Sequence, residues 1–241
     1  MNKLILLPSD VPATGKSTLA RCLSRYLDLH EVPHRCLAVG EEAHFTDEIE
    51  LAQLQPERLL ALFETASVVI LDLATGCAEP FARRFEAGNW AGLLTEHNIS
   101  LTVVLPVTAD PDSFEPVLAA VETYSDGAEY VITHLLSGCY DSEDRDWDRS
   151  YAARVMDMFE TAELYFPEAG AGLETELRAR RLTLAQALMV PAAESLLAKW
   201  LQPVLAQIDG IRRALFGEAL RPASARLATQ GKPERQKRVA A

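Results

Sequence analysis

The chain has 241 residues, 49% of them apolar, and a formal net charge of −12. A chain of this size and apolar content can bury a hydrophobic core without disulfides or a structural metal, and its four cysteines show no C-x-x-C spacing, as is typical of a single domain in a reducing cytoplasm. No stretch approaches about 18 uncharged apolar residues and the start shows no signal-peptide pattern, so we expect a cytoplasmic protein without a transmembrane segment.

Residues 3–25 begin with an apolar run, continue through a short turn-rich loop and end in an amphipathic helical pattern. This order predicts a strand, a phosphate-binding loop and a helix, although Gly-Lys-Ser-Thr also occurs at ordinary helix starts. A glycine lets backbone amides approach a phosphate, a lysine reaches β- and γ-phosphate oxygens, and a serine hydroxyl ligates Mg²⁺. The helix N-terminus also favours an anion. The residues expected to contact the nucleotide are Thr14, Gly15, Lys16, Ser17 and Thr18, with Ser17 as a magnesium ligand.

Beyond the loop, short apolar runs alternate with segments of helical length, which predicts parallel strands joined by helices that cover both faces of a sheet. Two of these runs, VVILDL and LTVVLPV, are continuously apolar, as central strands buried on both faces are. The fold class expected is α/β: a three-layer P-loop NTPase fold with a mostly parallel central sheet and a helical C-terminus. The predicted strands after the first are 34–39, 67–73, 100–105, 129–135 and 163–166.

Acidic residues stand at the ends of two of the predicted strands, at the edge where an open α/β sheet binds its ligand. Asp72 ends the run VVILD, where a phosphate-loop protein needs a carboxylate to hold Mg²⁺ or its water. Glu41 and Glu42 follow the second strand, and either could polarise a water or a substrate hydroxyl. The candidate catalytic residues are therefore Lys16, Asp72 and Glu41. A buried aspartate that bonds local amides and an exposed acidic turn are the structural alternatives.

Charge is unevenly distributed along the chain. Residues 211–241 contain eight basic and two acidic residues, a net charge of +6, which leaves −18 for residues 1–210. We therefore expect two parts: a nucleotide-binding domain over 1–210, and a C-terminal element over 211–241 made of an amphipathic helix and a disordered basic tail. Such a tail contacts DNA or an acidic protein partner, or only solubilises the terminus.

The order of five segments resembles the ParA/MinD-type deviant-Walker ATPases, and most closely the TraL/StbB-like proteins of conjugative and mobilisable plasmids. The segments are the loop ending GKST, VVILDLATG, LTVVLPVTADPDSFEPV, EYVITHLLSG, and ELYFPEAGAG followed by RRLTLAQAL. The resemblance implies a homodimer that binds ATP and Mg²⁺ at its interface and acts in plasmid transfer, mobilisation or stability.

Taken residue by residue, the resemblance implies phosphate and magnesium roles for Lys16 and Ser17 and the role of switch aspartate for Asp72. His134 stands where the family has an adenine-reading asparagine. Pro167 resembles the proline that packs beside the base. For His134, a packed and hydrogen-bonded core histidine is the alternative.

Several positions depart from the family pattern, and they concern the charges that surround the γ-phosphate. Asp10 replaces the first loop glycine, Val11 the signature lysine, Pro12 and Ala13 the paired glycines, and Ala38 and Gly40 the acids that end the second strand. We therefore expect nucleotide binding with slow hydrolysis.

Two other functions stay open on the sequence. The first is a P-loop kinase acting on a small molecule, for which Arg178, Arg180 and Arg181 are the compact lid candidates. The second is a non-hydrolysing nucleotide-binding adaptor that acts through its basic tail.

Overall fold

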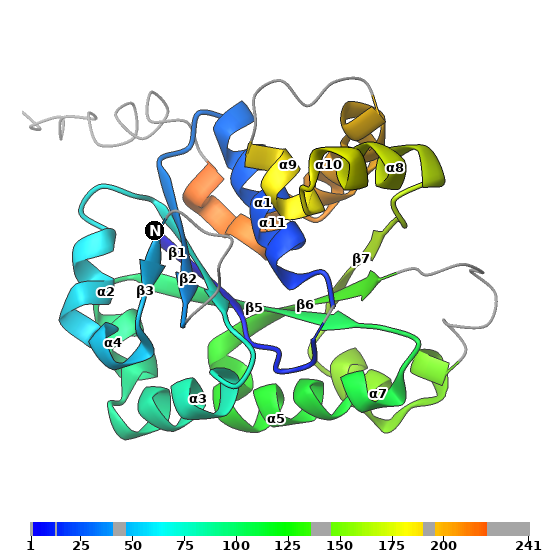
Figure 1. The fold of residues 1–241 in the computed structure, drawn as a ribbon. Helices are drawn as coiled ribbons and strands as arrows, with labels where there is room; N and C mark the ends of the chain where they lie inside the picture. The colour runs from blue at the N-terminus through cyan, green and yellow to red at the C-terminus, as the bar shows by residue number, and fades with distance from the viewer. Residues whose placement is uncertain (1, 13, 41–46, 136–145, 190–195, 221–241) are drawn as a thin grey trace, which may run out of the picture.

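The computed structural model describes residues 2–12, 14–40, 47–135, 146–189 and 196–220 (Figure 1). Its centre is a sheet with the strand order β3-β2-β4-β1-β5-β6-β7, in which all the described pairs are parallel. The strands are β1 Asn2–Leu7, β2 His34–Val39, β3 Glu48–Ile49, β4 Val68–Leu73, β5 Ile99–Val107, β6 Ala128–Leu135 and β7 Ala162–Phe166. The expected fold class is confirmed; the two-residue strand β3 was not predicted.

Helices cover both faces of the sheet, which gives three layers (Figure 1). One layer contains α1 Lys16–Leu29, α8 Ala171–Arg180, α9 Leu184–Met189, α10 Leu196–Gly210 and α11 Arg212–Phe216. The other contains α2 Pro56–Leu62, α3 Ala78–Ala87, α4 Trp90–Glu96, α5 Glu115–Tyr124 and α7 Tyr151–Asp157. No helix among the described residues is both long and apolar enough to cross a bilayer.

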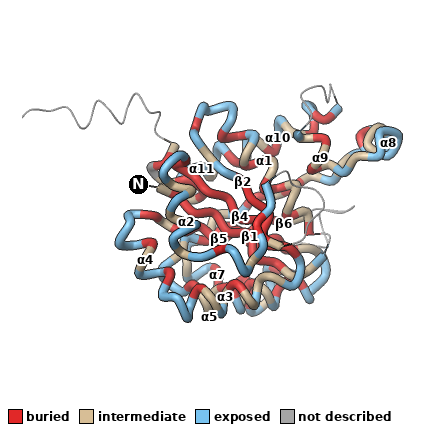
Figure 2. Tube along the Cα trace, turned by 60° about the vertical axis from the view of Figure 1, so that its left-hand side comes forward, coloured by how far each residue is buried: buried red, intermediate tan, exposed pale blue. Residues whose placement is uncertain are grey.

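The central strands are buried (Figure 2). Their apolar side chains alternate between two separate cores, one on each face of the sheet. In β1, Leu4 and Leu6 pack towards α3 and α5, whereas Ile5 and Leu7 pack towards α1. This double burial explains the continuous apolar runs in the sequence. Because side chains alternate along a strand, the buried residues also indicate which face of the sheet each other residue of that strand occupies.

The parallel register brings two predicted site segments to one edge of the sheet. Leu7, the last residue of β1, pairs with Asp72 of β4, and Asp72 pairs on its other side with Ala38 of β2. The predicted phosphate loop, which follows Leu7 and is called the phosphate loop below, therefore begins beside the loop that follows β4.

Residues 211–220 pack on the body of the protein. Leu215 and Phe216 of α11 are buried, and the short helix η4 (Gly217–Leu220) contacts β1. The Phe216 ring stacks on Tyr26 with centroids 5.5 Å apart, and Thr102 Oγ1 donates a hydrogen bond of 3.0 Å to the Ala214 carbonyl. The C-terminal element predicted over 211–241 is thus described only as far as residue 220, where it packs on the body, and the basic tail predicted over 221–241 lies outside the described residues.

We expect Phe216→Ala to lower the free energy of unfolding by about 3–5 kcal/mol, since it removes a fully buried ring that stacks on α1. Urea denaturation measures the change. The control Met158→Ala truncates a side chain that is 78% exposed and should change stability by less than about 0.5 kcal/mol. A loss below about 1 kcal/mol for Phe216→Ala would show that α11 is not part of the core.

Candidate functional site

The phosphate loop turns sharply into α1 at Gly15. Its backbone is left-handed (φ 72°), and a Cβ at this position would lie 3.2 Å from Leu135 Cδ1. A glycine is therefore favoured by both backbone conformation and space. Helix α1 has no acidic residue in its first turn and no side-chain cap at its N-terminus. No acidic side chain of that turn therefore offsets the positive end of the α1 dipole, which favours an anion there.

A cavity of about 310 Å³ opens at this helix start. Its wall contains the five residues predicted to contact the nucleotide, Thr14 to Thr18. The remaining wall comes from Val11 and Pro12 of the loop, Thr75 after β4, and Thr183 and Ala185 around the start of α9. The sequence did not single out these last three residues, although Thr183 and Ala185 lie in the segment RRLTLAQAL.

Lys16 places a buried cation in the cavity wall. The residue is 6% exposed, and its Nζ donates a hydrogen bond of 2.5 Å to the Ser9 carbonyl. Because an ammonium group has three donors, this bond leaves Lys16 able to donate to phosphate oxygens as well.

Asp72 lies close to the loop but outside the cavity lining. It is 1% exposed, and strand alternation puts it on the face of Ile70, which α1 covers. Burial raises the pKa of the nearby Cys36 thiol to about 12; the positive charge of Arg21 opposes this shift, and the negative charge of Asp72 adds to it. Asp72 and Arg21 therefore belong to one electrostatic environment beneath the loop.

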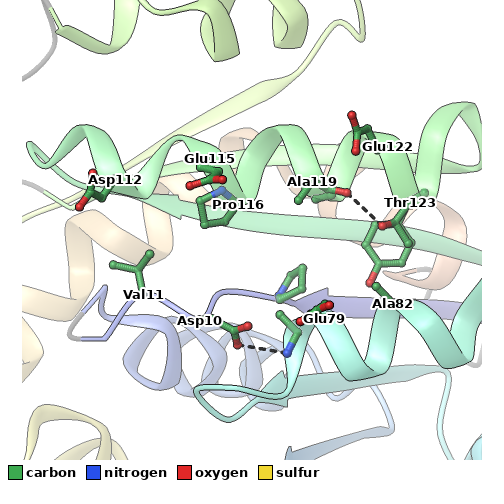
Figure 3. A pocket seen from close by; sticks show the side chains of 14 residues that line it. Asp10, Val11, Glu79, Ala82, Asp112, Glu115, Pro116, Ala119, Glu122 and Thr123 are labelled. Atoms are coloured by element: carbon green, nitrogen blue, oxygen red, sulfur yellow. Dashed lines mark hydrogen bonds between the residues drawn. The ribbon is translucent and has the colours of Figure 1, made fainter.

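Asp10 ties the phosphate loop to the start of α3. Its Oδ1 accepts a hydrogen bond of 2.8 Å from the amide of Gly76 and one of 3.1 Å from the amide of Ala78, the second of which is drawn in Figure 3. Ala78 is the first residue of α3, so the carboxylate lies at a helix N-terminus, where a negative charge is stabilised. Because the negative charge of Asp10 is held at the start of α3, an acidic residue in the phosphate loop is compatible with an anion-binding site at the start of α1.

The structure explains why no acid ends the second strand. Ala38 is fully buried in the core beside α1. Gly40 has a φ of 108°, and a Cβ there would lie 2.8 Å from both Ala74 Cβ and Cys77 Sγ. A side chain at residue 40 is excluded by backbone conformation and by contact. Glu41, one of the candidate catalytic residues, lies outside the described residues, as does Glu42.

His134 does not line the phosphate-loop cavity. It shares the face of Ile132, which α5 and α7 cover, whereas α1 covers the opposite face. Its ring stacks on Tyr165 at 4.6 Å and meets the edge of Trp147 at 5.8 Å, and its Nε2 lies 3.3 Å from Glu163 Oε2. Interaction with His134 and a hydrogen bond from Tyr165 hold the pKa of Glu163 below its usual value.

Pro167 and the three arginines considered for a kinase lid also lie outside the lining of the phosphate-loop cavity. The Pro167 carbonyl accepts a hydrogen bond of 2.9 Å from Trp200 Nε1. The arginines considered for a kinase lid are exposed on α8 and just beyond it, where Arg180 pairs with Glu176 at 2.8 Å. The structure therefore brings together Thr14 to Thr18, places Asp72 nearby, and leaves His134 and Pro167 apart from them.

No family model and no curated protein matches the chain. Among solved structures it is similar to a ParA family ATPase from Chlorobium tepidum, with 12% identity, a TM-score of 0.47, and coverage of 86% of this chain and 99% of that chain. It is also similar to the MinD cell division protein of Aquifex aeolicus, with 11% identity, a TM-score of 0.49, and coverage of 87% and 98%. At these identities and TM-scores, the likenesses decide neither family nor function.

We expect Asp10→Ala to lower the free energy of unfolding by about 1–3 kcal/mol, because two backbone amides lose a charged acceptor. The amides of Gly76 and Ala78 should also exchange hydrogen faster. Asp10→Asn is the matched control, since its amide oxygen can still accept both bonds, and it should lose less stability. If Asp10→Ala changed neither the free energy of unfolding nor the hydrogen exchange of Gly76 and Ala78, the stabilising role of the two Asp10 hydrogen bonds would be contradicted.

Proposed function

We propose that the chain binds ATP with Mg²⁺ through its phosphate loop and acts as a nucleotide-controlled switch. The observation that carries the proposal is the cavity at the start of α1, whose wall contains Thr14 to Thr18 and the buried Lys16. An uncapped helix N-terminus and a buried lysine beside it form a binding site for phosphate groups.

The residues present fit a magnesium nucleotide. Gly15 keeps the loop backbone close to the cavity, and Asp10 holds its charge on the α3 side. Lys16 and the loop amides would hold the phosphates, while Ser17 and Asp72 would hold Mg²⁺ directly or through water. The bound ion would neutralise phosphate charge.

Three other residues favour slow hydrolysis of the bound ATP. Val11 brings no positive charge to the γ-phosphate, and neither Ala38 nor Gly40 offers a carboxylate to orient water. The close packing around Gly40 leaves no room for a carboxylate side chain at that position.

The Asp10 tether gives the switch a structural basis. It joins the phosphate loop to the loop that follows β4 and begins two residues after Asp72. A nucleotide that prefers one arrangement of the phosphate loop would therefore also bias the position of the α3 start.

The biological setting rests on the order of segments in the sequence. We include in the proposal a ParA/MinD-like homodimer in the cytoplasm, with ATP at its interface, that serves plasmid conjugative transfer, mobilisation or stability as TraL/StbB-like proteins do.

We expect Lys16→Ala to weaken ATP binding at least about 100-fold, on the order of 3 kcal/mol, because the phosphates lose their buried cation. Titration of a fluorescent ATP analogue in the presence of Mg²⁺ measures the affinity. Lys199→Ala removes an exposed lysine from α10 and is the matched control. Equal affinity of the two variants would refute the proposed binding site.

We expect the isolated protein to hydrolyse on the order of 10 ATP molecules per hour or fewer, since the groups that assist the γ-phosphate are missing. Asp72→Asn should reduce the dependence of ATP affinity on Mg²⁺ more than the affinity itself. Phosphate release, and ATP titration with Mg²⁺ or with a chelator, measure the two quantities. Turnover of several per second would contradict slow hydrolysis.

A further inference from the structure

A second cavity, of about 460 Å³, lies between the phosphate loop, α3 and α5 (Figure 3). Its walls are largely apolar, with Val11 from the loop, Ala82 from α3, and Pro116 and Ala119 from α5. Val11 also lines the phosphate-loop cavity, so the loop separates the two spaces. This cavity takes no part in the nucleotide site described above.

Among the described residues, every charged side chain that lines the second cavity is acidic. These side chains are Asp10, Glu79, Asp112, Glu115 and Glu122. Asp10 is bound to the amides of Gly76 and Ala78, and Glu79 lies 3.2 Å from Arg83. Asp112 and Glu115 are exposed at the start of α5 and can accept hydrogen bonds from cations.

Tyr124 adds a polar group to this wall. It is 5% exposed, and its hydroxyl has no hydrogen-bond partner among the described residues. Burial raises the pKa of Tyr124, so the hydroxyl stays protonated and can donate a hydrogen bond. A hydroxyl without a partner among the described residues can donate to an acceptor that enters the cavity, such as a peptide carbonyl.

We propose that this cavity binds the basic C-terminal segment of the chain, residues 221–241. The segment contains six basic residues and Glu234, a net charge of +5, whereas residues 1–210 carry −18. Arginine and lysine side chains can lay their apolar stems on the alanine and proline wall and donate to the carboxylates at its rim. A carbonyl of the segment can accept from the Tyr124 hydroxyl.

The segment is long enough to reach the cavity. Twenty-one residues follow Leu220. Extended, they span up to roughly 70 Å, against a radius of gyration of roughly 18 Å for a compact chain of this length. The last described helix, η4, belongs to the layer opposite the cavity, so the segment passes around the sheet or comes from a second copy. In either case it contacts the phosphate loop through Asp10 and Val11.

Carbodiimide cross-linking of the full chain tests this proposal. The reagent joins a lysine amine to a carboxylate as an amide, with the water taken up by the carbodiimide, and Lys232 and Lys237 are the only lysines of the segment. We expect their links, mapped by mass spectrometry, to favour Glu79, Asp112, Glu115 and Glu122 over the exposed Glu57, Glu64 and Glu96 by at least about threefold. Mixing chains of two isotope labels shows whether the links lie within one copy or between two.

The double variant Asp112→Asn/Glu115→Gln retains Glu79 and Glu122, and links to these two should fall by at least about threefold. The matched control Glu64→Gln/Glu96→Gln makes the same charge change away from the cavity and should leave them unchanged. Links spread evenly over surface acids would overturn the proposal. So would salt-dependent retention of the chain on DNA without enrichment at the cavity, which would assign the segment to DNA. The experiment uses no nucleotide, so its outcome is independent of ATP binding.

Discussion

The parallel pairing of β1 with β4 is the constraint on which the rest of the site depends. It aligns Leu7 with Asp72, so two loops that are more than sixty residues apart in the chain begin side by side. Burial on both faces holds β1 in that register, because a shift of one residue would move its apolar side chains to the wrong core. The cavity at Lys16, the position of Asp72 and the Asp10 tether all follow from this alignment.

Two helix N-termini meet at this edge, and they are used differently. The start of α3 receives the carboxylate of Asp10, an internal anion supplied by the phosphate loop itself. The start of α1 has neither an acidic first turn nor a side-chain cap, and it faces a cavity with Lys16 in its wall. One positive helix end is thus offset by a carboxylate of the protein itself, whereas the first turn of the other carries no acidic residue, which is an arrangement suited to phosphate.

Much of this could be predicted from the sequence, because local patterns determine it. The strand His34–Val39 was predicted with its observed bounds, and a helix was predicted directly after the Gly-Lys-Ser-Thr loop, although Lys16 to Thr18 already form the first turn of α1. Features that depend on distant residues could not be predicted. Nothing near Asp10 indicates that its partners are Gly76 and Ala78, and the strand end at His134 suggested a ligand contact although its face is filled by Trp147 and Tyr165. The short strand β3 has no periodicity to recognise, and the core packing of α11 depends on Tyr26.

The packing around Gly40 restricts how this sequence can change. A carboxylate at that position would require a side chain where Ala74 and Cys77 already lie 2.8 Å from the Cβ position, on a backbone with positive φ. A single substitution at Gly40 therefore meets a steric penalty before any catalytic gain can appear. An evolutionary path, or a directed-evolution library, would first have to shift the backbone around Ala74 and Cys77, so mutations at these positions are expected to show strong epistasis with residue 40.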